Sequence, residues 1–296
     1  MRPPAGKPAI PVAADDRRPF HGNATTSNRN NCEPKRGQVS NRIVVLGSCG
    51  AWPEPSRACS GFYIESQGAR MVLDLGYGTL PRLLSLLGST TGDGLEAVIV
   101  THRHPDHMVD LHGLMRARWF GRRSSPAIPL YAPAGVVSSL LELEEGDATA
   151  IRHVFDWHAL PMQPYQVGPF TLEALSLPHH VPNAGVRLTS SSSVIAYTGD
   201  SGPDPALSVL AAGADVFIAE ATDRDPYPDE SPPRFAPTLH MGAAQAGQAA
   251  ASAQARLLLL THFWPGYDRE RSRALAAAHF TGNVVLADEG LEIPLP

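Results

Sequence analysis

The feature that most constrains this chain is a group of histidines placed directly after an apolar run. The run at 97–101 reads AVIVT and predicts a buried β-strand, and it is followed at 102–107 by HRHPDH. His102 and His104 are two residues apart, so both imidazoles project to the same side of an extended segment. Pro105 then turns the chain. The segment therefore predicts polar side chains that converge from two directions at the end of one strand.

Asp106 and His107 follow the proline and complete a set of four potential metal ligands within six residues. Neutral imidazoles and carboxylates are the ligands that Zn²⁺ takes in hydrolytic sites. A solvated, charged loop is the alternative interpretation of such a segment. The pattern H-x-H-x-D-H at a strand end favours a metal site strongly over that alternative.

The remainder of the chain predicts an α/β fold. Apolar runs predict strands at 42–47, 61–65, 70–75, 97–101, 127–131, 170–177, 192–198, 214–219, 256–261 and 283–286. Amphipathic stretches predict helices at 79–87, 107–117, 134–144, 204–212, 241–254 and 268–279. The strands come first as hairpins and then alternate with helices, and no linker interrupts residues 42–296, which predicts a single domain there.

Residues 1–40 are rich in Pro, Arg, Asn and Ser and lack apolar periodicity, which predicts a disordered N-terminal extension. They carry a net charge of +4 against −5 for the whole chain, so −9 remains for residues 41–296. This acidic body disfavours broad, charge-driven binding of nucleic acid. The three cysteines are too few for a disulfide scaffold and indicate a reducing compartment, so we expect a cytoplasmic protein. The chain has no apolar run long enough to span a membrane, and we expect no membrane partner.

The HRHPDH segment resembles the signature of the metallo-β-lactamase superfamily, in which H-x-H-x-D-H follows a β-strand. The resemblance extends over about residues 42–296 and implies an αββα sandwich of two mixed β-sheets flanked by helices. Asp74 in the sequence DLG resembles an early aspartate that is structural in the family. Asp200 in TGDS resembles the bridging aspartate, and His262 in LTHF resembles the last histidine ligand.

The third-histidine segment of the family is similar to PHHVPNAGVR at 178–187. In the family a proline stands three residues and a glycine six residues after the ligand. Counting back from Pro182 and Gly185 selects His179, and His180 beside it leaves the choice open by one residue.

The resemblance implies two divalent metal ions, expected to be Zn²⁺, with Mn²⁺ or Fe as alternatives. The implied ligands are His102, His104 and His179 for one metal, Asp106, His107 and His262 for the other, and Asp200 as the bridge. Two metals a few ångström apart can share a hydroxide nucleophile and polarise an ester. Taken alone, Asp200 could cap the helix expected at 204 and His262 could be a strand-end histidine, but their joint order outweighs that alternative.

Two further segments resemble the ribonuclease Z branch of the superfamily, AEAT at 219–222 and LHMGA at 239–243. In that branch a glutamate and a histidine pair beside the metals, which here implies His240 as general acid or leaving-group stabiliser and Glu220 as its partner. Asp106 is the implied proton acceptor. The alternatives are a helix-start residue without a catalytic role for His240 and a buried structural carboxylate for Glu220.

The resemblance departs from the tRNA-processing members in one respect. Those members carry an extended arm between the third histidine and the bridging aspartate, whereas only about a dozen residues separate Gly185 from the TGD motif at 198–200. Together with the acidic body, this favours a small phosphodiester substrate over RNA. The compact layout resembles the arm-less members that include cyclic-nucleotide phosphodiesterases, which implies a substrate such as a cyclic nucleotide. The alternatives are a tRNA 3′-end endonuclease and a lactone, ester or sulfate-ester hydrolase. The resemblance also implies a homodimer.

Overall fold

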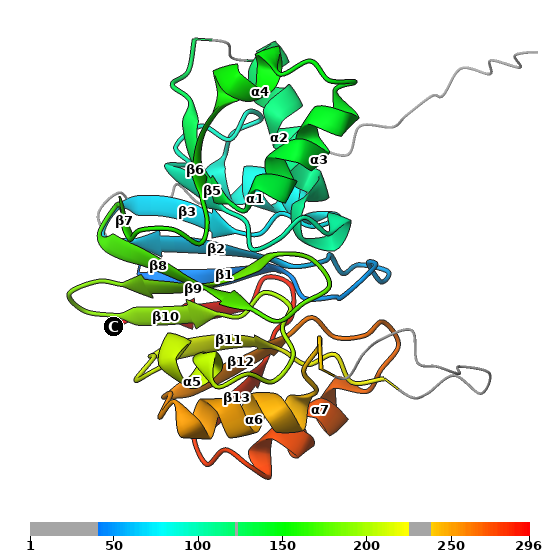
Figure 1. Ribbon diagram of the computed structural model, residues 1–296, viewed down its shortest axis with the longest axis vertical. Helices are drawn as coiled ribbons and strands as arrows, with labels where there is room; N and C mark the ends of the chain where they lie inside the picture. Colours follow the sequence, from blue (N-terminus) through cyan, green and yellow to red (C-terminus); the bar gives the residue numbers. More distant parts are fainter. Residues whose placement is uncertain (1–40, 122–123, 225–237) are drawn as a thin grey trace, which may run out of the picture. The chain divides into compact units, whose positions relative to one another are not determined.

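The computed structural model describes residues 41–121, 124–224 and 238–296, which build two seven-stranded β-sheets and the helices around them (Figure 1). The predicted disorder of residues 1–40 concerns a segment outside the described residues. Among the helices of the described segments, none is both long enough and apolar enough to cross a membrane.

The first sheet contains the N-terminal half of the strands and one strand from the C-terminus. Its order is β14 (Glu292–Pro294), β1 (Arg42–Gly47), β2 (Gly61–Ser66), β3 (Ala69–Leu73), β4 (Ala97–Ile99), β5 (Ile128–Ala132) and β6 (Phe155–Ala159). Strands β1 to β3 pair antiparallel, and β3 to β6 pair parallel. The predicted change from hairpins to parallel strands is confirmed.

The second sheet repeats this arrangement. Its order is β13 (Asn283–Leu286), β12 (Leu257–Thr261), β11 (Val216–Glu220), β10 (Val194–Tyr197), β9 (Asn183–Thr189), β8 (Phe170–Leu177) and β7 (Tyr165–Val167). Strands β7 to β10 pair antiparallel and β10 to β13 pair parallel. The polar residues that follow β4, β10 and β12 therefore leave the carboxyl ends of parallel strands, where α/β sheets bind ligands.

Seven helices are described, four placed beyond the first sheet and three beyond the second (Figure 1). They are α1 (Thr79–Leu87), α2 (Pro105–Gly121), α3 (Ala134–Leu143), α4 (Thr149–Val154), α5 (Ala206–Leu210), α6 (Ala243–Ser252) and α7 (Arg269–Ala277). The predicted αββα architecture is confirmed.

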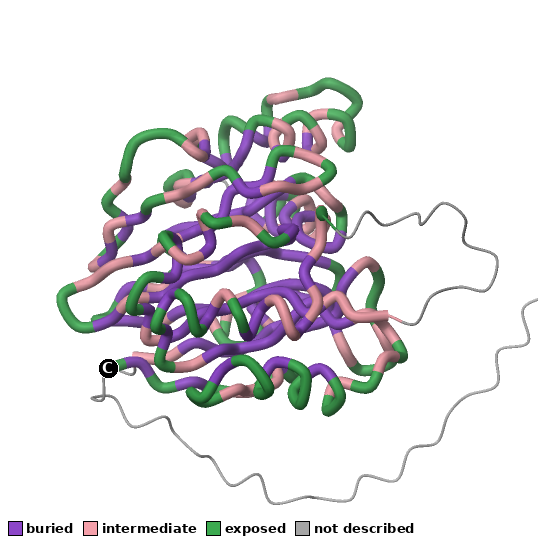
Figure 2. Tube along the Cα trace, turned by 60° about the horizontal axis from the view of Figure 1, so that its bottom comes forward, coloured by how far each residue is buried: buried purple, intermediate pink, exposed green. Residues whose placement is uncertain are grey.

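The alternation of side chains along the strands explains why the two sheets stack. In β1, Ile43 and Val45 join the apolar core shared with the second sheet, whereas Val44 and Leu46 join the core beneath α1 to α4. Both faces of the sheet are thus buried, which is why β1 reads as a continuous apolar run. Figure 2 shows buried strands at the centre and the exposed chain around them.

The structure corrects several element predictions. Helix α2 begins at Pro105 instead of 107, because proline suits the first helical position, where no N–H is needed. Asp106 and His107 therefore lie in its first turn. The short α4 and the strands β6, β7, β9 and β14 were not predicted as separate elements. Strand β9 forms a hairpin with β10, and β7 and β14 have three residues each, which is too short for a period of two to stand out.

Candidate metal centre

The residues predicted as metal ligands come from four separate segments and meet between the carboxyl ends of the two sheets. They form two groups that share one carboxylate. The first cluster contains His102, His104, His179 and Asp200, and the second cluster contains Asp106, His107, Asp200 and His262. In each group one ligand atom of every residue lies within 4.8 Å of the others, which is the spacing expected around a single cation.

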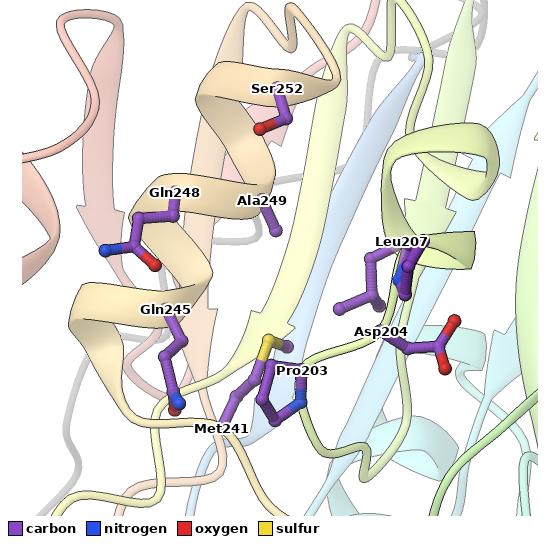
Figure 3. Close-up of a pocket in the computed structure, with 9 residues that line it drawn as sticks. Pro203, Asp204, Leu207, Met241, Gln245, Gln248, Ala249 and Ser252 are labelled. Atoms are coloured by element: carbon purple, nitrogen blue, oxygen red, sulfur yellow. The ribbon is translucent and has the colours of Figure 1, made fainter. Parts of the chain in front are cut away.

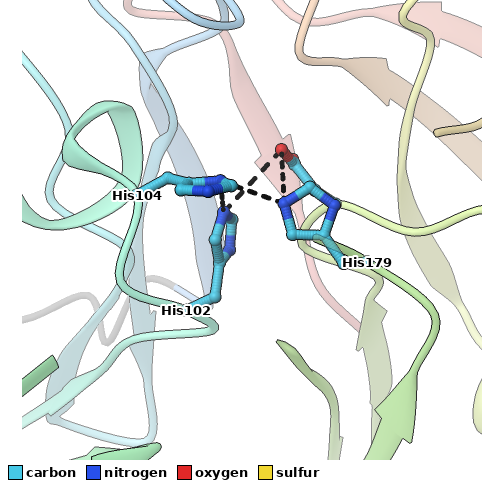
Figure 4. A group of neighbouring side chains, drawn as sticks. His102, His104 and His179 are labelled. Atoms are coloured by element: carbon cyan, nitrogen blue, oxygen red, sulfur yellow. Dashed lines mark hydrogen bonds and ion pairs between the residues drawn. The ribbon is translucent and has the colours of Figure 1, made fainter. Parts of the chain in front are cut away.

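In the first cluster three imidazoles turn their nitrogens toward one point (Figure 4). Nδ1 of His104 lies 3.1 Å from Nε2 of His102 and 3.0 Å from Nε2 of His179. Oδ2 of Asp200 lies 3.8 Å from His102 Nε2 and 3.7 Å from His179 Nε2. His180 is exposed and packs edge-on against His179 outside the cluster. The structure thus brings His179, and not His180, to the other ligands.

In the second cluster the other oxygen of Asp200 takes part. Oδ1 of Asp200 lies 3.1 Å from His107 Nε2 and 3.3 Å from His262 Nε2. Oδ2 of Asp106 lies 3.2 Å from His262 Nε2 and 3.7 Å from His107 Nε2. Because its two oxygens face different clusters, Asp200 stands where a bridging carboxylate is required.

Two buried polar atoms at the middle of this arrangement test whether cations fit it. His107 Nε2 and Asp200 Oδ1 are buried and make no hydrogen bond, although they are 3.1 Å apart. Buried polar atoms are almost always satisfied, so such orphans need a partner of another kind. Five imidazoles and two carboxylates without cysteine form a donor set typical of Zn²⁺ in hydrolases. The residues present therefore fit a dinuclear metal site.

Asp74 fixes the ring orientations on one side of the centre. Its buried carboxylate lies 2.7 Å from Nδ1 of His107, and it accepts hydrogen bonds from the hydroxyls of Tyr197 at 2.8 Å and Thr101 at 2.9 Å. Because the Thr101 proton points to Asp74, its oxygen accepts from Nδ1 of His102 at 3.1 Å. Nδ1 of both histidines thus carries the proton, and the lone pair of Nε2 faces the cluster.

Glu220 and Thr222 do the same on the other side. The Thr222 hydroxyl donates a short hydrogen bond to Oε2 of Glu220, so its oxygen accepts from Nδ1 of His262 at 2.8 Å. Likewise, the carbonyl of Leu239 lies 3.2 Å from Nδ1 of His179 and can only accept. Outer hydrogen bonds therefore turn the Nε2 lone pair of each of these histidines inward.

The pKa values of the imidazoles are lowered in the first cluster and raised in the second for His107 and His262. Burial lowers the pKa of all three histidines of the first cluster, that of His102 well below its ordinary range and that of His179 to about 4. In the second cluster burial acts in the same direction, but the neighbouring carboxylates, Asp200 and Asp106 above all, together outweigh it and raise the pKa of His107 and His262. The first cluster therefore offers neutral ligands at pH 7, whereas the second holds protons that a cation has to displace.

His240 lies beside both clusters. Its ring packs edge-on against His179 at 4.9 Å between centroids and stacks on His262 at 6.1 Å. Nδ1 of His240 lies 3.0 Å from Oε2 of Glu220, which is fully buried and also accepts from the backbone N–H of Ser201. The structure thus brings His240 and Glu220 together as a pair at the edge of the centre.

A loop from the first sheet contacts the second cluster through its backbone. The N–H of Ala51 donates to Oδ2 of Asp106 at 2.7 Å, and a side chain at Gly50 would overlap the ring of His262. Glu289 closes this loop, because its Oε1 accepts from the N–H groups of Ser48 at 3.1 Å and Ala58 at 3.0 Å. The loop therefore presents an amide to a carboxylate of the centre from a fixed frame.

Backbone conformation adds a further constraint. Asp74, Ala51 and His262 all have positive φ angles, of 57°, 61° and 55°. Such conformations are unfavourable for residues with a side chain and concentrate at functional sites. The same constraint explains Gly199 before Asp200, whose φ is +56° and whose Cβ would overlap Thr101.

Several polar residues make their contacts away from the centre. His112 pairs with Glu144 at 2.6 Å, and His158 stacks on Tyr131. Arg187 donates to the carbonyl of Leu210 at the end of α5. A groove of about 300 Å³ between α5 and α6 is lined by Pro203, Leu207, Met241, Gln245 and neighbouring residues (Figure 3).

Sequence reasoning missed the residues that orient the ligands. Thr101, Thr222, Tyr197 and the amide of Ala51 were not assigned a role. Thr101 directly precedes His102, and Thr222 stands two residues after Glu220. A threonine near the end of a strand has no distinctive pattern, so neither was predicted to orient a ligand. Asn183 was also missed, although its amide donates to the carbonyls of Thr198 and Asp200 and supports the bridging segment.

Residues 74–263 match the family model of the beta-lactamase superfamily domain, and the chain belongs to the metallo-β-lactamase superfamily. With the buried His/Asp centre, this defines a metal-dependent hydrolase. The uncharacterized protein Rv1339 of Mycobacterium tuberculosis is 34% identical over 266 residues, which cover 86% of this chain and 93% of that protein.

Two further relatives have more informative names. The probable metallo-hydrolase YhfI of Bacillus subtilis is 28% identical over 84% of this chain and 98% of that protein. Its crystal structure matches with a TM-score of 0.73 at 27% identity, covering 86% of this chain and 99% of that one. A ribonuclease Z of Mycolicibacterium paratuberculosis is 28% identical over 83% of this chain and 95% of that protein. The resemblance inferred from the motifs is confirmed.

Proposed function

We propose that this protein is a dinuclear metal-dependent phosphodiesterase that cleaves small substrates such as cyclic nucleotides. The observation that carries the proposal is the pair of His240 and Glu220, 3.0 Å apart and in contact with both clusters. Expelling an alkoxide from a phosphodiester needs a proton donor, and an imidazole held by a carboxylate is suited to that task.

The metal ligands in this proposal follow from the two clusters. One Zn²⁺ would be held by His102, His104 and His179, a second by Asp106, His107 and His262, with Asp200 between them. When bound, such a pair supplies Lewis-acid polarisation of the phosphate and an activated water at neutral pH.

His240 supplies the proton in this scheme. Its Nδ1–H donates to Glu220, which leaves Nε2 to hold the proton for the departing oxygen. Burial opposes the charged imidazolium, but the hydrogen bond and the negative charge of Glu220 prevail and raise the pKa of His240 to about 9. Asp106, whose Oδ2 accepts from the amide of Ala51 and lies 3.2 Å from Nε2 of His262, is the proton acceptor in this scheme.

The shape of the chain near the centre favours a small substrate over RNA. Strands β9 and β10 are joined by the tight turn at 190–193, which the N–H of Ser190 closes by donating to Ser193, and no arm is built there. The net charge of −9 over residues 41–296 also opposes a large phosphate backbone. The similarity to a protein named ribonuclease Z supports phosphodiester cleavage and keeps precursor tRNA among the substrates to be tested.

A substrate panel tests the proposal. The metal-loaded full chain is assayed on 3′,5′-cyclic AMP, bis-p-nitrophenyl phosphate, a precursor tRNA and a simple lactone, with the His240→Ala variant alongside. We expect hydrolysis of both small phosphodiesters and little cleavage of the tRNA. Activity on the lactone alone would contradict a phosphodiesterase, and efficient cleavage of the tRNA would replace the small substrate by RNA.

A further inference from the structure

An exposed aromatic pair lies on the loops that carry the second cluster. The rings of Trp52 and Trp264 pack edge to face, with centroids 5.0 Å apart and an interplanar angle of 82°. Trp52 is 44% exposed. The edge of one indole thus fixes the plane of the other, while a face of Trp52 remains open to solvent.

The backbone places this pair beside the metal centre. Trp52 follows Ala51, whose amide donates to Asp106 Oδ2 at 2.7 Å, and consecutive Cα atoms are only about 3.8 Å apart. Trp264 is two residues beyond His262. Trp52 therefore lies one residue after the amide that contacts the second cluster. Trp264 lies two residues after His262, which belongs to that cluster.

The turn that projects Trp52 is strained. The N–H of Trp52 donates to the carbonyl of Gly50 at 2.7 Å across Ala51, whose φ is +61°. This is a γ-turn with a left-handed central residue, a rare and unfavourable conformation. Strained conformations of this kind persist where the surrounding structure requires them. Here the γ-turn directs the Ala51 amide to Asp106 and places the Trp52 indole at the rim of the second cluster.

Two neighbours extend this rim. Tyr77 is 37% exposed and follows Gly76, which lies so close to the carbonyl of Asp106 that a Cβ there would be 1.9 Å from its oxygen. The guanidinium of Arg224 lies 5.6 Å from the ring centroid of Trp264. Exposed aromatic rings and the Arg224 guanidinium thus lie on the segments around the second cluster.

We propose that the open face of Trp52, supported by Trp264, stacks against the planar base of a nucleotide substrate. This inference rests on the proposed function only in taking the phosphate to lie at the two clusters. A π-face beside a phosphate site distinguishes a nucleotide from a sugar phosphate or a lactone, because only the nucleotide carries a flat aromatic group. Base–aromatic stacking tolerates any base, so we infer selectivity for nucleotides without strong preference among them.

The test measures binding of a ligand that is not consumed. Adenosine 5′-monophosphate and ribose 5-phosphate are titrated calorimetrically into the metal-loaded full chain and into Trp52→Ala, Trp52→Phe and the matched control Trp157→Phe. Trp157 is 42% exposed on the edge strand β6, in a different region of the first sheet. Metal content and thermal melting of each variant are recorded, so that a folding defect is recognised.

We expect Trp52→Ala to bind the nucleotide roughly tenfold more weakly, the size expected for one lost base–aromatic stack, with unchanged affinity for ribose 5-phosphate. Trp52→Phe should recover part of the loss, and Trp157→Phe should behave as wild type. In a background with Trp119 and Trp157 replaced by Phe, the nucleotide should quench the remaining fluorescence and ribose 5-phosphate should not. Equal binding of the two ligands by the wild type, or unchanged nucleotide binding by Trp52→Ala, overturns the inference.

The two proposals fail in different ways. A wild type that hydrolyses no phosphodiester but still binds the nucleotide through Trp52 contradicts the proposed function and supports the stacking site. A wild type that hydrolyses phosphodiesters, with Trp52 variants that bind the nucleotide normally, supports the proposed function and contradicts the stacking site.

Discussion

The hydroxyl of Thr222 accepts a hydrogen bond from Nδ1 of His262 at 2.8 Å and donates one to Oε2 of Glu220. Thr101 stands between His102 and Asp74 in the same way on the opposite side of the centre. Each carboxylate thus orients a histidine through a threonine. These outer hydrogen bonds turn Nε2 of each histidine toward the centre, and they are present before any cation binds.

Replacing Thr222 by Val removes the acceptor for His262 Nδ1 while nearly keeping the shape of the side chain. We expect the affinity for the second metal to fall by about 10- to 100-fold, with little change at the first. Competition with a chelating dye measures both affinities. Thr222→Ser keeps the hydroxyl and serves as the control. Two metals bound by the valine variant with wild-type affinity would show that the threonine does not orient the ligand.

Removing the imidazole of His240 separates substrates by their leaving groups. His240→Ala should slow the hydrolysis of a substrate with an alkoxide leaving group by about 10²- to 10⁴-fold. A p-nitrophenyl ester should lose far less, because its leaving group departs without a proton. The measurement is kcat/KM on both substrates with two metals confirmed in the variant. Equal losses on the two would exclude His240 as the acid.

Metal loading should depend on pH unequally at the two clusters. The pKa of His179 falls to about 4 through burial, so the first cluster is deprotonated at pH 6 and at pH 8. Burial lowers the pKa values of His107 and His262, but Asp200 and Asp106 together raise them by more, so these imidazoles hold protons in the metal-free chain that leave as the pH rises.

We therefore expect about two Zn²⁺ per chain at pH 8 and closer to one at pH 6, determined by equilibrium dialysis and elemental analysis. Proton release, counted by calorimetry in buffers of different ionisation enthalpy, should accompany mainly the second binding event. Loss of both metals with the same pH midpoint would contradict this difference between the clusters.

Close packing of two backbones makes Gly76 sensitive to substitution. A Cβ at this position would lie 1.9 Å from the carbonyl oxygen of Asp106, at the start of α2. Gly76→Ala should therefore lower the free energy of unfolding by at least about 1–3 kcal/mol and weaken the second metal site. Urea unfolding at constant Zn²⁺ measures the first effect.

The control for this substitution is Gly113→Ala within α2. A Cβ there would meet the end of the flexible Leu80 side chain at 2.8 Å, and alanine favours a helix over glycine. We expect little loss of stability in this variant. If both alanine variants unfolded at the wild-type urea concentration, the backbone of Asp106 would have to be free to move away from Gly76.

The amino-acid sequence by itself determined which strands are followed by polar residues and which residue types could bind a metal there. His102, Asp200 and His262 each follow a short apolar run, and both the run and the residue after it are local patterns that can be read without a structure. The fold class followed from the same runs, because hairpins followed by alternating strands and helices permit few arrangements.

Only the tertiary structure decided which side chains meet across the two sheets. It placed His179 in the first cluster and His180 outside, although the two are neighbours in the chain. It also joined the amide of Ala51 to Asp106, and Trp52 to Trp264, which are far apart in sequence. Such contacts depend on how the sheets stack and how strained loops close, and periodicity along the chain carries no information about either.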